Sequence, residues 1–289
     1  MEAMPDSLMA QLNLTGKKLS KSHQKIADYL EKHYEKAVSL TALSLSEAVG
    51  VSESTVVRFA MALGYEGYPE MHRALQETVR HRLTANQRFD MAADIMEDDV
   101  MMTVLKTDMG NIRATIGEMD QAAFKRAVSL LLSARRIYIL GLRSAAPLAQ
   151  FLGYYLNFIF DNVRVVAASS SDVYEDIARV GEKDVLIGIS FPRYSTRTLE
   201  AMRFAKKSRA EVIALTDGDR SPLCRAADVC LTARTNMASF VDSLAAPLSL
   251  INALIVAVGL HKKEELRTHL NQLEGIWTEH RVYLHEQQG

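Results

Sequence analysis

The sequence has few cysteines, almost no net charge and no long apolar run, and each shortage excludes a class of protein. Two cysteines in 289 residues are too few for a small scaffold held together by disulfides. The longest apolar stretch, 244–260, contains Pro247, Ser249 and Asn252, so it falls short of the roughly 18 uninterrupted residues of a membrane span. Residues 1–14 lack the basic and apolar segments of a secretory signal. We therefore expect a protein of the reducing cytoplasm that does not bind a membrane.

The sequence also has little that predicts a metal, a cofactor or a disulfide. Cys224 and Cys230 could bridge or bind a metal, but no cluster of His or Cys accompanies them, so we interpret them as small packed residues without a function. His280 and His285 stand five residues apart, and there is no Walker-type loop or His-Glu-x-x-His motif. We expect no cofactor, no metal site and no catalytic residue.

Charge does not predict a nucleic-acid partner either. The net charge is −1, and residues 1–85 carry ten Lys or Arg against ten Asp or Glu. Evidence for a DNA partner must therefore come from the sequence pattern.

The pattern of residues 19–83 predicts helices only. Apolar residues recur every three or four positions from Leu19, which predicts an amphipathic helix. Ser20 is a suitable N-cap for this helix. Within 40–64, two short helices are predicted around Gly50, where a chain leaving a helix often needs a positive φ. A DNA-reading helix-turn-helix has a small residue, then a glycine, then two apolar residues at fixed spacing. The sequence matches this spacing with Ser46, Gly50, Val56 and Phe59.

The second of these helices is the predicted recognition helix. Ser52 is expected to cap it, and the residues away from its apolar side are expected in the major groove of double-stranded DNA: Ser52, Glu53, Ser54, Thr55 and Arg58. An isolated Ser or Arg is more often a cap or a solvated charge, but the complete apolar pattern around them favours DNA contact. Glu47 and Glu53 would repel phosphate.

The remainder of the chain predicts an α/β domain. Residues 86–118 are interpreted as a linker and a connecting helix between a helix-turn-helix domain, 1–85, and a second domain, 119–289. From residue 120, short apolar runs alternate with helical stretches, which predicts a five-stranded, parallel, doubly wound sheet. The expected strands are 137–140, 163–167, 185–189, 212–215 and 229–231.

Ligands of such sheets bind at the carboxyl ends of the strands, so the loops there are the candidate sites. Three loops, 141–146, 168–172 and 190–196, carry hydroxyl groups and lead into helices, which predicts an anionic ligand.

This combination resembles the RpiR family of transcriptional regulators, whose members join a helix-turn-helix to a sugar isomerase (SIS) domain. The first half resembles the family in Gly50–Phe59 and Leu63–Tyr68, and the second half in Gly141–Ser144, Ile189–Ser195 and Val212–Thr216. The resemblance implies a homodimeric or homotetrameric regulator of sugar or amino-sugar metabolism genes, controlled by a phosphosugar or related metabolite.

The sequence departs from the family pattern in two ligand loops. Arg143 stands where the first loop of relatives often has Gly, and Arg193 replaces Gly in the third. Losing glycine removes a close backbone approach to phosphate, but arginine can bind an anion bidentately. We expect an altered anion site, and the alternative is that the arginines pair with acidic neighbours or fill a site that binds nothing. The expected effector residues are Arg143, Ser144, Ser190, Arg193, Tyr194 and Ser195.

Two other function classes remain open. The same fold hosts sugar-phosphate isomerases, which need an acid or base, and the carboxylates near the predicted loops are those of Glu175, Asp176 and Asp217. A scaffold protein is the third possibility, and DNA binding without marked salt dependence would favour it.

Overall fold

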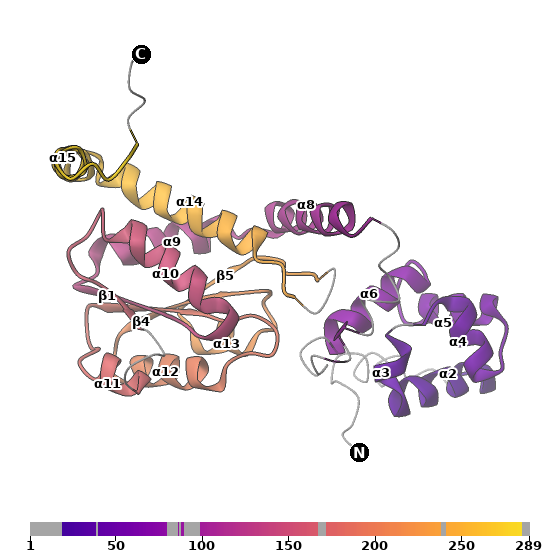
Figure 1. The fold of residues 1–289 in the computed structure, drawn as a ribbon. Helices are drawn as coiled ribbons and strands as arrows, with labels where there is room; N and C mark the ends of the chain where they lie inside the picture. Colours follow the sequence, from indigo (N-terminus) through magenta and orange to yellow (C-terminus); the bar gives the residue numbers. More distant parts are fainter. Residues whose placement is uncertain are drawn as a thin grey trace, which may run out of the picture. The chain divides into compact units, whose positions relative to one another are not determined.

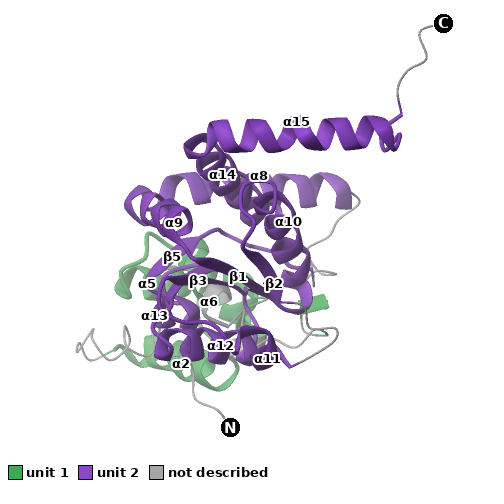
Figure 2. Cartoon of the chain, turned by 90° about the vertical axis from the view of Figure 1, so that its left-hand side faces the viewer, with its two compact units in different colours: residues 1–97 green, residues 98–289 purple. Residues whose placement is uncertain are grey.

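The computed structural model describes residues 19–38, 40–79, 86, 88–89, 99–166, 172–237 and 241–284. The chain divides into two compact units, residues 1–97 and 98–289, which Figure 2 shows in different colours. Each unit has its own hydrophobic core. The domain limits predicted from the sequence stay a prediction.

The described part of the first unit is helical. Its helices are α2 (Lys21–Lys32), α3 (Tyr34–Ala37), α4 (Ala42–Val49), α5 (Glu53–Ala62) and α6 (Tyr68–Val79). Ser20 caps α2 as predicted, because its hydroxyl accepts a hydrogen bond from the backbone N–H of His23 at 3.2 Å. The core contains Ile26 and Leu30 of α2, Leu45 of α4 and Phe59 of α5, all fully buried.

The second unit contains the predicted five-stranded parallel sheet. The strands are β1 (Arg136–Gly141), β2 (Val163–Val166), β3 (Asp184–Ile189), β4 (Glu211–Thr216) and β5 (Val229–Thr232), in the order β2-β1-β3-β4-β5. All neighbouring pairs are parallel, so the predicted strands and fold class are confirmed.

Helices cover both faces of this sheet (Figure 1). The elements around the strands are α8 (Val100–Glu118), α9 (Gln121–Ser133), η1 (Arg143–Ala145), α10 (Ala146–Leu156), α11 (Val173–Ile177), α12 (Thr196–Lys207), α13 (Pro222–Ala226), α14 (Ala245–His261) and α15 (Lys263–Glu279). Helices α9, α10 and α14 pack on one face, and α11, α12 and α13 on the other. Successive strand residues point to opposite faces of the sheet. Ile139 therefore packs in the core beneath α9, α10 and α14, and Leu140 packs in the core beneath α11, α12 and α13.

Helix α8, which the sequence predicted as a connecting helix, packs against α14 in the second unit. The Asn111 side-chain N–H donates to the carbonyl oxygen of Asn236 at 2.8 Å, and the Asn236 N–H donates to Asn111 Oδ1 at 2.9 Å. This reciprocal pair fixes α8 on the strand-to-helix segment after β5.

The apolar run 244–260 forms α14, whose buried residues include Leu250, Ile251 and Leu254. Among the residues that the structure describes, no single helix is long and apolar enough to span a membrane. Together α14 and α15 have the required length and composition, but a bend of 102° separates them.

Cys224 of α13 and Cys230 of β5 form a disulfide, with 5.1 Å between their Cα atoms. The interpretation of these cysteines as two separate packed residues was therefore wrong. The chain turns from α13 directly into β5, and this turn brings together two side chains that are six residues apart. Periodicity alone does not show such a reversal.

Candidate functional site

The turn between α4 and α5 has the geometry of a helix-turn-helix. Gly50 has φ 70°, and it ends α4 in the left-handed conformation that the sequence predicted. The N–H of Val51 donates to the carbonyl oxygen of Ser46 at 3.0 Å, which closes the turn. Ser46 is 4% exposed, so its small side chain fits where the two helices approach each other.

One face of α5 presents hydroxyl groups and a guanidinium. Ser52, Glu53, Ser54 and Arg58 are exposed, and Thr55 is half-buried. Arg58 Nε donates to the Ser54 carbonyl oxygen at 3.1 Å, which holds the guanidinium over the first turn of the helix. The five predicted DNA-binding residues therefore lie together at the start of α5.

Ser52 occupies the N-cap position of α5, but its side chain makes no capping hydrogen bond. Its hydroxyl instead lies 3.0 Å from Ser54 Oγ and 2.8 Å from Thr55 Oγ1. The predicted position is right and the predicted bond is wrong, because neighbouring hydroxyls on the first turn are within reach of Ser52 Oγ. These hydroxyls could exchange their mutual bonds for bonds to phosphate oxygens or base edges.

Helix α6 braces this motif through two partly buried polar contacts. The Tyr68 hydroxyl donates to the carbonyl oxygen of Leu40 at 2.6 Å, and burial raises the pKa of Tyr68 to about 12. His72 Nε2 lies 2.9 Å from the Val38 carbonyl oxygen. Burial lowers the pKa of His72 below its ordinary value, and the hydrogen bond to Val38 opposes this shift.

In the second unit, the order of the sheet places a topological switch point between β1 and β3. The chain proceeds from β1 to β2 on one side, and the later strands continue on the other side. Gly141 and Ile189 are paired at the carboxyl ends of β1 and β3, so the loops after them leave the same edge side by side. Ligands of doubly wound sheets bind at such a point.

Arg143 and Arg193 lie in these two loops, and both have a left-handed backbone, with φ 57° and 66°. Both side chains are exposed, and neither has an ion-pair or hydrogen-bond partner among the described residues. The left-handed conformation favours glycine and is unfavourable for arginine by roughly 1–2 kcal/mol. The chain therefore keeps a backbone suited to glycine at both positions while it presents two unpaired cations.

The other predicted effector residues form the frame of the third loop. Ser190 is 5% exposed, and its hydroxyl accepts from the N–H of Ser195 at 3.0 Å. Ser195 caps α12 by accepting from the N–H of Thr198 at 3.3 Å. Ser144 is exposed in η1. The predicted second loop, 168–172, lies outside the described residues except for Asp172, which caps α11.

The structure adds a polar network that the sequence did not predict. The Tyr194 hydroxyl donates to Asp217 Oδ1 at 2.8 Å, which links the loop after β3 to the loop after β4. Thr216 Oγ1 lies 3.1 Å from Asp217 Oδ1 and 2.8 Å from Ser221 Oγ. The position of Thr216 and Asp217 at the end of a predicted strand was the available signal.

Two of the three candidate carboxylates are already engaged. Asp217 accepts from Tyr194, and Asp176 forms an ion pair with Arg164. Glu175 is exposed on α11. No pair of carboxylates at this edge is arranged as an acid and a base among the described residues.

Comparison with known families agrees with this architecture. Residues 7–82 match the model described as "Helix-turn-helix domain, rpiR family", and residues 130–257 match the SIS domain model. The chain belongs to the RpiR family. It is a helix-turn-helix transcriptional regulator with a SIS domain, so the predicted family, fold and general function are confirmed.

Individual relatives resemble this RpiR-family chain over most of their length. It is 27% identical over 277 residues to the HTH-type transcriptional regulator HexR of Pseudomonas aeruginosa, covering 93% of this chain and 94% of HexR. The sugar isomerase domain of an RpiR transcription factor from Sphaerobacter thermophilus matches with a TM-score of 0.59 at 25% identity, covering 61% of this chain and 99% of that one. Vibrio vulnificus NanR, complexed with ManNAc-6P, matches with a TM-score of 0.56 at 19% identity, covering 94% and 98%, and shows the same fold.

Proposed function

We propose that this RpiR-family regulator controls genes of sugar or amino-sugar metabolism in the cytoplasm and responds to a small anionic, phosphosugar-like metabolite. It reads a double-stranded DNA operator with Ser52, Glu53, Ser54, Thr55 and Arg58. The effector binds at the switch point of the SIS domain, and it contacts Arg143, Ser144, Ser190, Arg193, Tyr194 and Ser195. The SIS domain acts as a sensor and performs no catalysis.

The observation that carries this proposal is a pair of arginines on the two loops beside the switch point, neither of which has an ion-pair or hydrogen-bond partner among the residues that the structure describes. Strained residues cluster at ligand sites, so two strained cations at corresponding places beside the switch point support a ligand site there. The alternative that Arg143 and Arg193 are neutralised by acidic neighbours finds no support among the described residues. Two guanidinium groups can bind phosphate oxygens bidentately.

The relatives support the same assignment. NanR has the same fold and is complexed with ManNAc-6P. HexR, which matches nearly the full length of this chain, is a transcriptional regulator. We therefore favour regulation by a phosphosugar over isomerase activity, for which the described carboxylates offer no matched acid and base.

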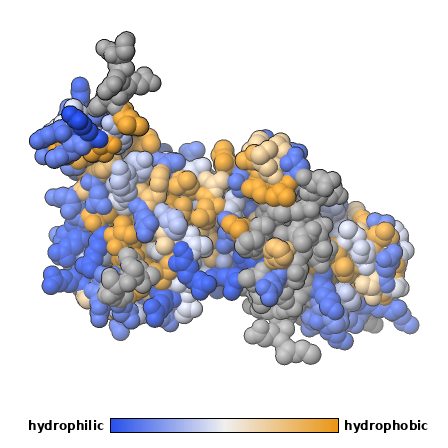
Figure 3. All heavy atoms as spheres, in the orientation of Figure 1, coloured by the Kyte–Doolittle hydropathy of each residue, from blue (hydrophilic) through white to orange (hydrophobic). Residues whose placement is uncertain are grey.

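We further propose that the protein acts as a homodimer or homotetramer assembled through its second unit. Apolar side chains are exposed along α8, where Figure 3 shows hydrophobic residues gathered at the surface: Met101, Leu105, Met109 and Ile116. A contiguous apolar surface of this kind is typical of a protein interface. A symmetric pair of recognition helices would read a roughly palindromic operator.

The proposed effector site is tested by thermal shift with sugar phosphates, amino-sugar phosphates and carboxylated sugars. A ligand present at about 100 times its Kd stabilises the folded protein by roughly 2.7 kcal/mol, which raises its Tm. Arg193→Ala should lose this response, because it removes one of the two anion-binding cations.

Arg209→Ala is the matched control. Arg209 is exposed and also has a left-handed backbone, with φ 65°, but it precedes β4 at the opposite edge of the sheet. It therefore reproduces the loss of charge and the relief of strain without touching the site. An equal response in wild type and Arg193→Ala would refute the arginine-based site, and no response to any anion would refute a phosphosugar effector.

A further inference from the structure

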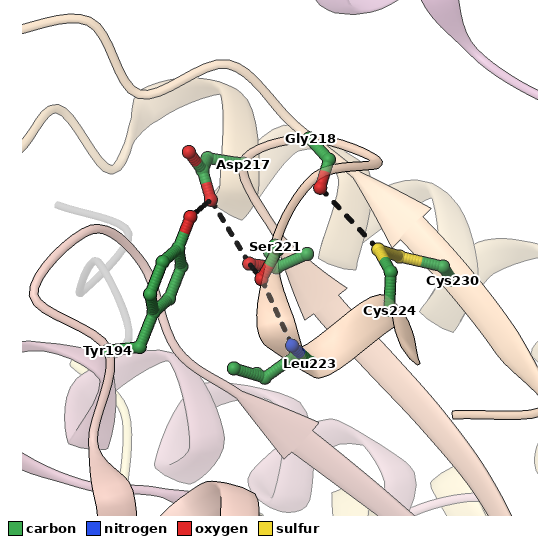
Figure 4. Close-up of a disulfide and its surroundings, with 8 residues drawn as sticks. Tyr194, Asp217, Gly218, Ser221, Leu223, Cys224 and Cys230 are labelled. Carbon is green, nitrogen blue, oxygen red and sulfur yellow. Dashed lines mark hydrogen bonds between the residues drawn. A yellow bond between two sulfur atoms is a disulfide. The ribbon is translucent and has the colours of Figure 1, made fainter. Parts of the chain in front are cut away.

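The disulfide lies next to the loop that follows β4. Cys224 belongs to the short helix α13, and Cys230 belongs to β5, the strand at the edge of the sheet (Figure 4). The bond therefore ties α13 to the sheet at one end of its edge strand. The Cys224 sulfur lies 3.5 Å from the carbonyl oxygen of Gly218, within the loop that precedes α13.

A chain of hydrogen bonds connects α13 with the candidate effector site. Ser221 caps α13 by accepting from the N–H of Leu223 at 3.2 Å, and the Ser221 hydroxyl lies 2.8 Å from Thr216 Oγ1. Thr216 Oγ1 contacts Asp217, and Asp217 accepts from the Tyr194 hydroxyl at 2.8 Å. Thr216 and Ser221 are 0% and 2% exposed, so water does not compete for these bonds. Tyr194 directly follows Arg193.

Three features fit a bond that forms and breaks in use. Both cysteines are only half-buried, so a small thiol or disulfide can reach them. The six-residue separation closes a short loop, for which a cross-link contributes least to stability. A DNA-binding regulator works where thiols are normally kept reduced, and disulfides in that setting are usually transient or redox-sensing.

We propose that Cys224 and Cys230 are a reversible thiol–disulfide modification site whose state sets the order of the loop 190–195. The oxidant is a low-molecular-weight disulfide such as glutathione disulfide. The thiolate of one cysteine attacks it and releases one glutathione, and the thiolate of the other cysteine then attacks the mixed disulfide and releases a second glutathione. The two protons of the cysteine thiols pass to the two glutathione thiolates, and the two electrons lost by the pair reduce one disulfide to two thiols.

Each state acts on α13 in a different way. The disulfide holds α13 on β5. This keeps the hydroxyl of Ser221 beside Thr216 and Asp217, and it preserves the hydrogen bond from Tyr194 to Asp217. Reduction breaks this link and gives Cys224 an S–H group that can donate a hydrogen bond to the carbonyl oxygen of Gly218. A disulfide sulfur carries no hydrogen and cannot donate this bond. The oxidised protein therefore holds its effector loop in order before the ligand arrives.

The direct test is hydrogen–deuterium exchange on the full chain, oxidised with glutathione disulfide or reduced with dithiothreitol. Mass spectrometry with thiol alkylation defines the two states, which differ by two hydrogen atoms. Reduction should speed exchange in peptides covering 216–226 and 190–196, and leave α9 unchanged. Tyr194→Phe should keep the effect in 216–226 and lose it in 190–196, because it removes the last bond of the chain.

The control is the double variant Cys224→Ser and Cys230→Ser, in which dithiothreitol should change nothing. Cysteines that stay reduced in excess glutathione disulfide, or equal exchange of 190–196 in both states, would overturn the proposal. This readout needs no ligand and so does not depend on the proposed function.

The consequence for sensing rests on the proposed function. The phosphosugar found by thermal shift should bind the oxidised protein about five-fold more tightly, at the lower end of the coupling typical between two sites. Equal affinities for the two states would refute the coupling to the effector. If neither state binds any sugar phosphate while the exchange difference persists, the phosphosugar assignment fails and the redox site stands.

Discussion

Single side chains in this protein occupy backbone positions that do not suit them. Among the described residues, five side-chain-bearing residues have a positive φ, and four of them are arginines: Arg143, Arg193, Arg209 and Arg281. The first two lie in the loops beside the switch point. A glycine at either position would relieve strain but remove a cation, so arginine there presents a charge at a cost in stability.

His72 makes the stability of the first unit depend on pH. Its pKa is lowered in the folded protein because the ring is partly buried, so the folded state favours the neutral ring. This contribution is complete above the ordinary pKa of about 6.5 and is lost as the pH falls through that value toward the lowered pKa. We expect the denaturation midpoint of wild type to fall between pH 7 and pH 5, and that of His72→Gln to fall less.

Urea denaturation followed by circular dichroism at several pH values provides the comparison. Gln keeps a side-chain donor for the Val38 carbonyl oxygen but does not titrate. The same pH dependence in both proteins would show that other groups are responsible.

At the scale of elements, the helix-turn-helix depends on one glycine. Gly50 ends α4 with φ 70°, and the N–H groups of Gly50 and Val51 close the turn onto α4. A Cβ at Gly50 would meet no atom within 4 Å, so backbone conformation, not space, is what requires glycine there. The direction of α5 therefore depends on this left-handed residue.

Gly50→Ala should destabilise the first unit by about 1 kcal/mol, because alanine is strained in the left-handed conformation. It should also weaken DNA binding, since α5 carries the residues that we propose read the operator. Gly117→Ala in α8 is the matched control. Gly117 is exposed, helical and without neighbours within 4 Å of a built Cβ, so alanine there should stabilise by about 0.5–1 kcal/mol.

Both variants can be compared by urea denaturation of the full chain. If both substitutions changed the free energy of unfolding in the same direction, the conformation of Gly50 would not be what limits stability.

At the scale of the whole molecule, DNA binding comes from a unit without a basic excess, since residues 1–85 carry ten basic and ten acidic side chains. The few exposed cations near α5 must then account for the contacts with phosphate. Arg58 is one of the proposed DNA-binding residues, and its guanidinium is held over the first turn of α5.

We expect operator affinity to fall with salt, with a slope of about −0.9 for each phosphate contacted in a plot of log K against log salt concentration. Arg58→Ala should reduce the magnitude of this slope by about 1 if Arg58 contacts a phosphate. Arg126→Ala, which removes an exposed arginine from α9, should leave the slope unchanged. Fluorescence anisotropy with a labelled operator measures the salt dependence of wild type and of both variants. Binding that does not depend on salt would favour the interpretation of the protein as a scaffold.

The sequence by itself determined the order of the elements, the five strands, the helix-turn-helix spacing and the loops at the ligand edge of the sheet. These features depend on local periodicity and on glycine, serine and apolar residues at fixed spacings, which the one-dimensional pattern records. The positions of Ser20 and Gly50 show this, because each acts through neighbours within five residues.

Only the tertiary structure decided which side chains meet across the fold. The left-handed arginines, the disulfide of Cys224 and Cys230, and the bond from Tyr194 to Asp217 depend on where separate loops pack. The bond from His72 to Val38 likewise joins residues 34 apart in the chain. Such contacts are set by the geometry of the packed sheet and helices, and residue spacing along the chain does not encode that geometry.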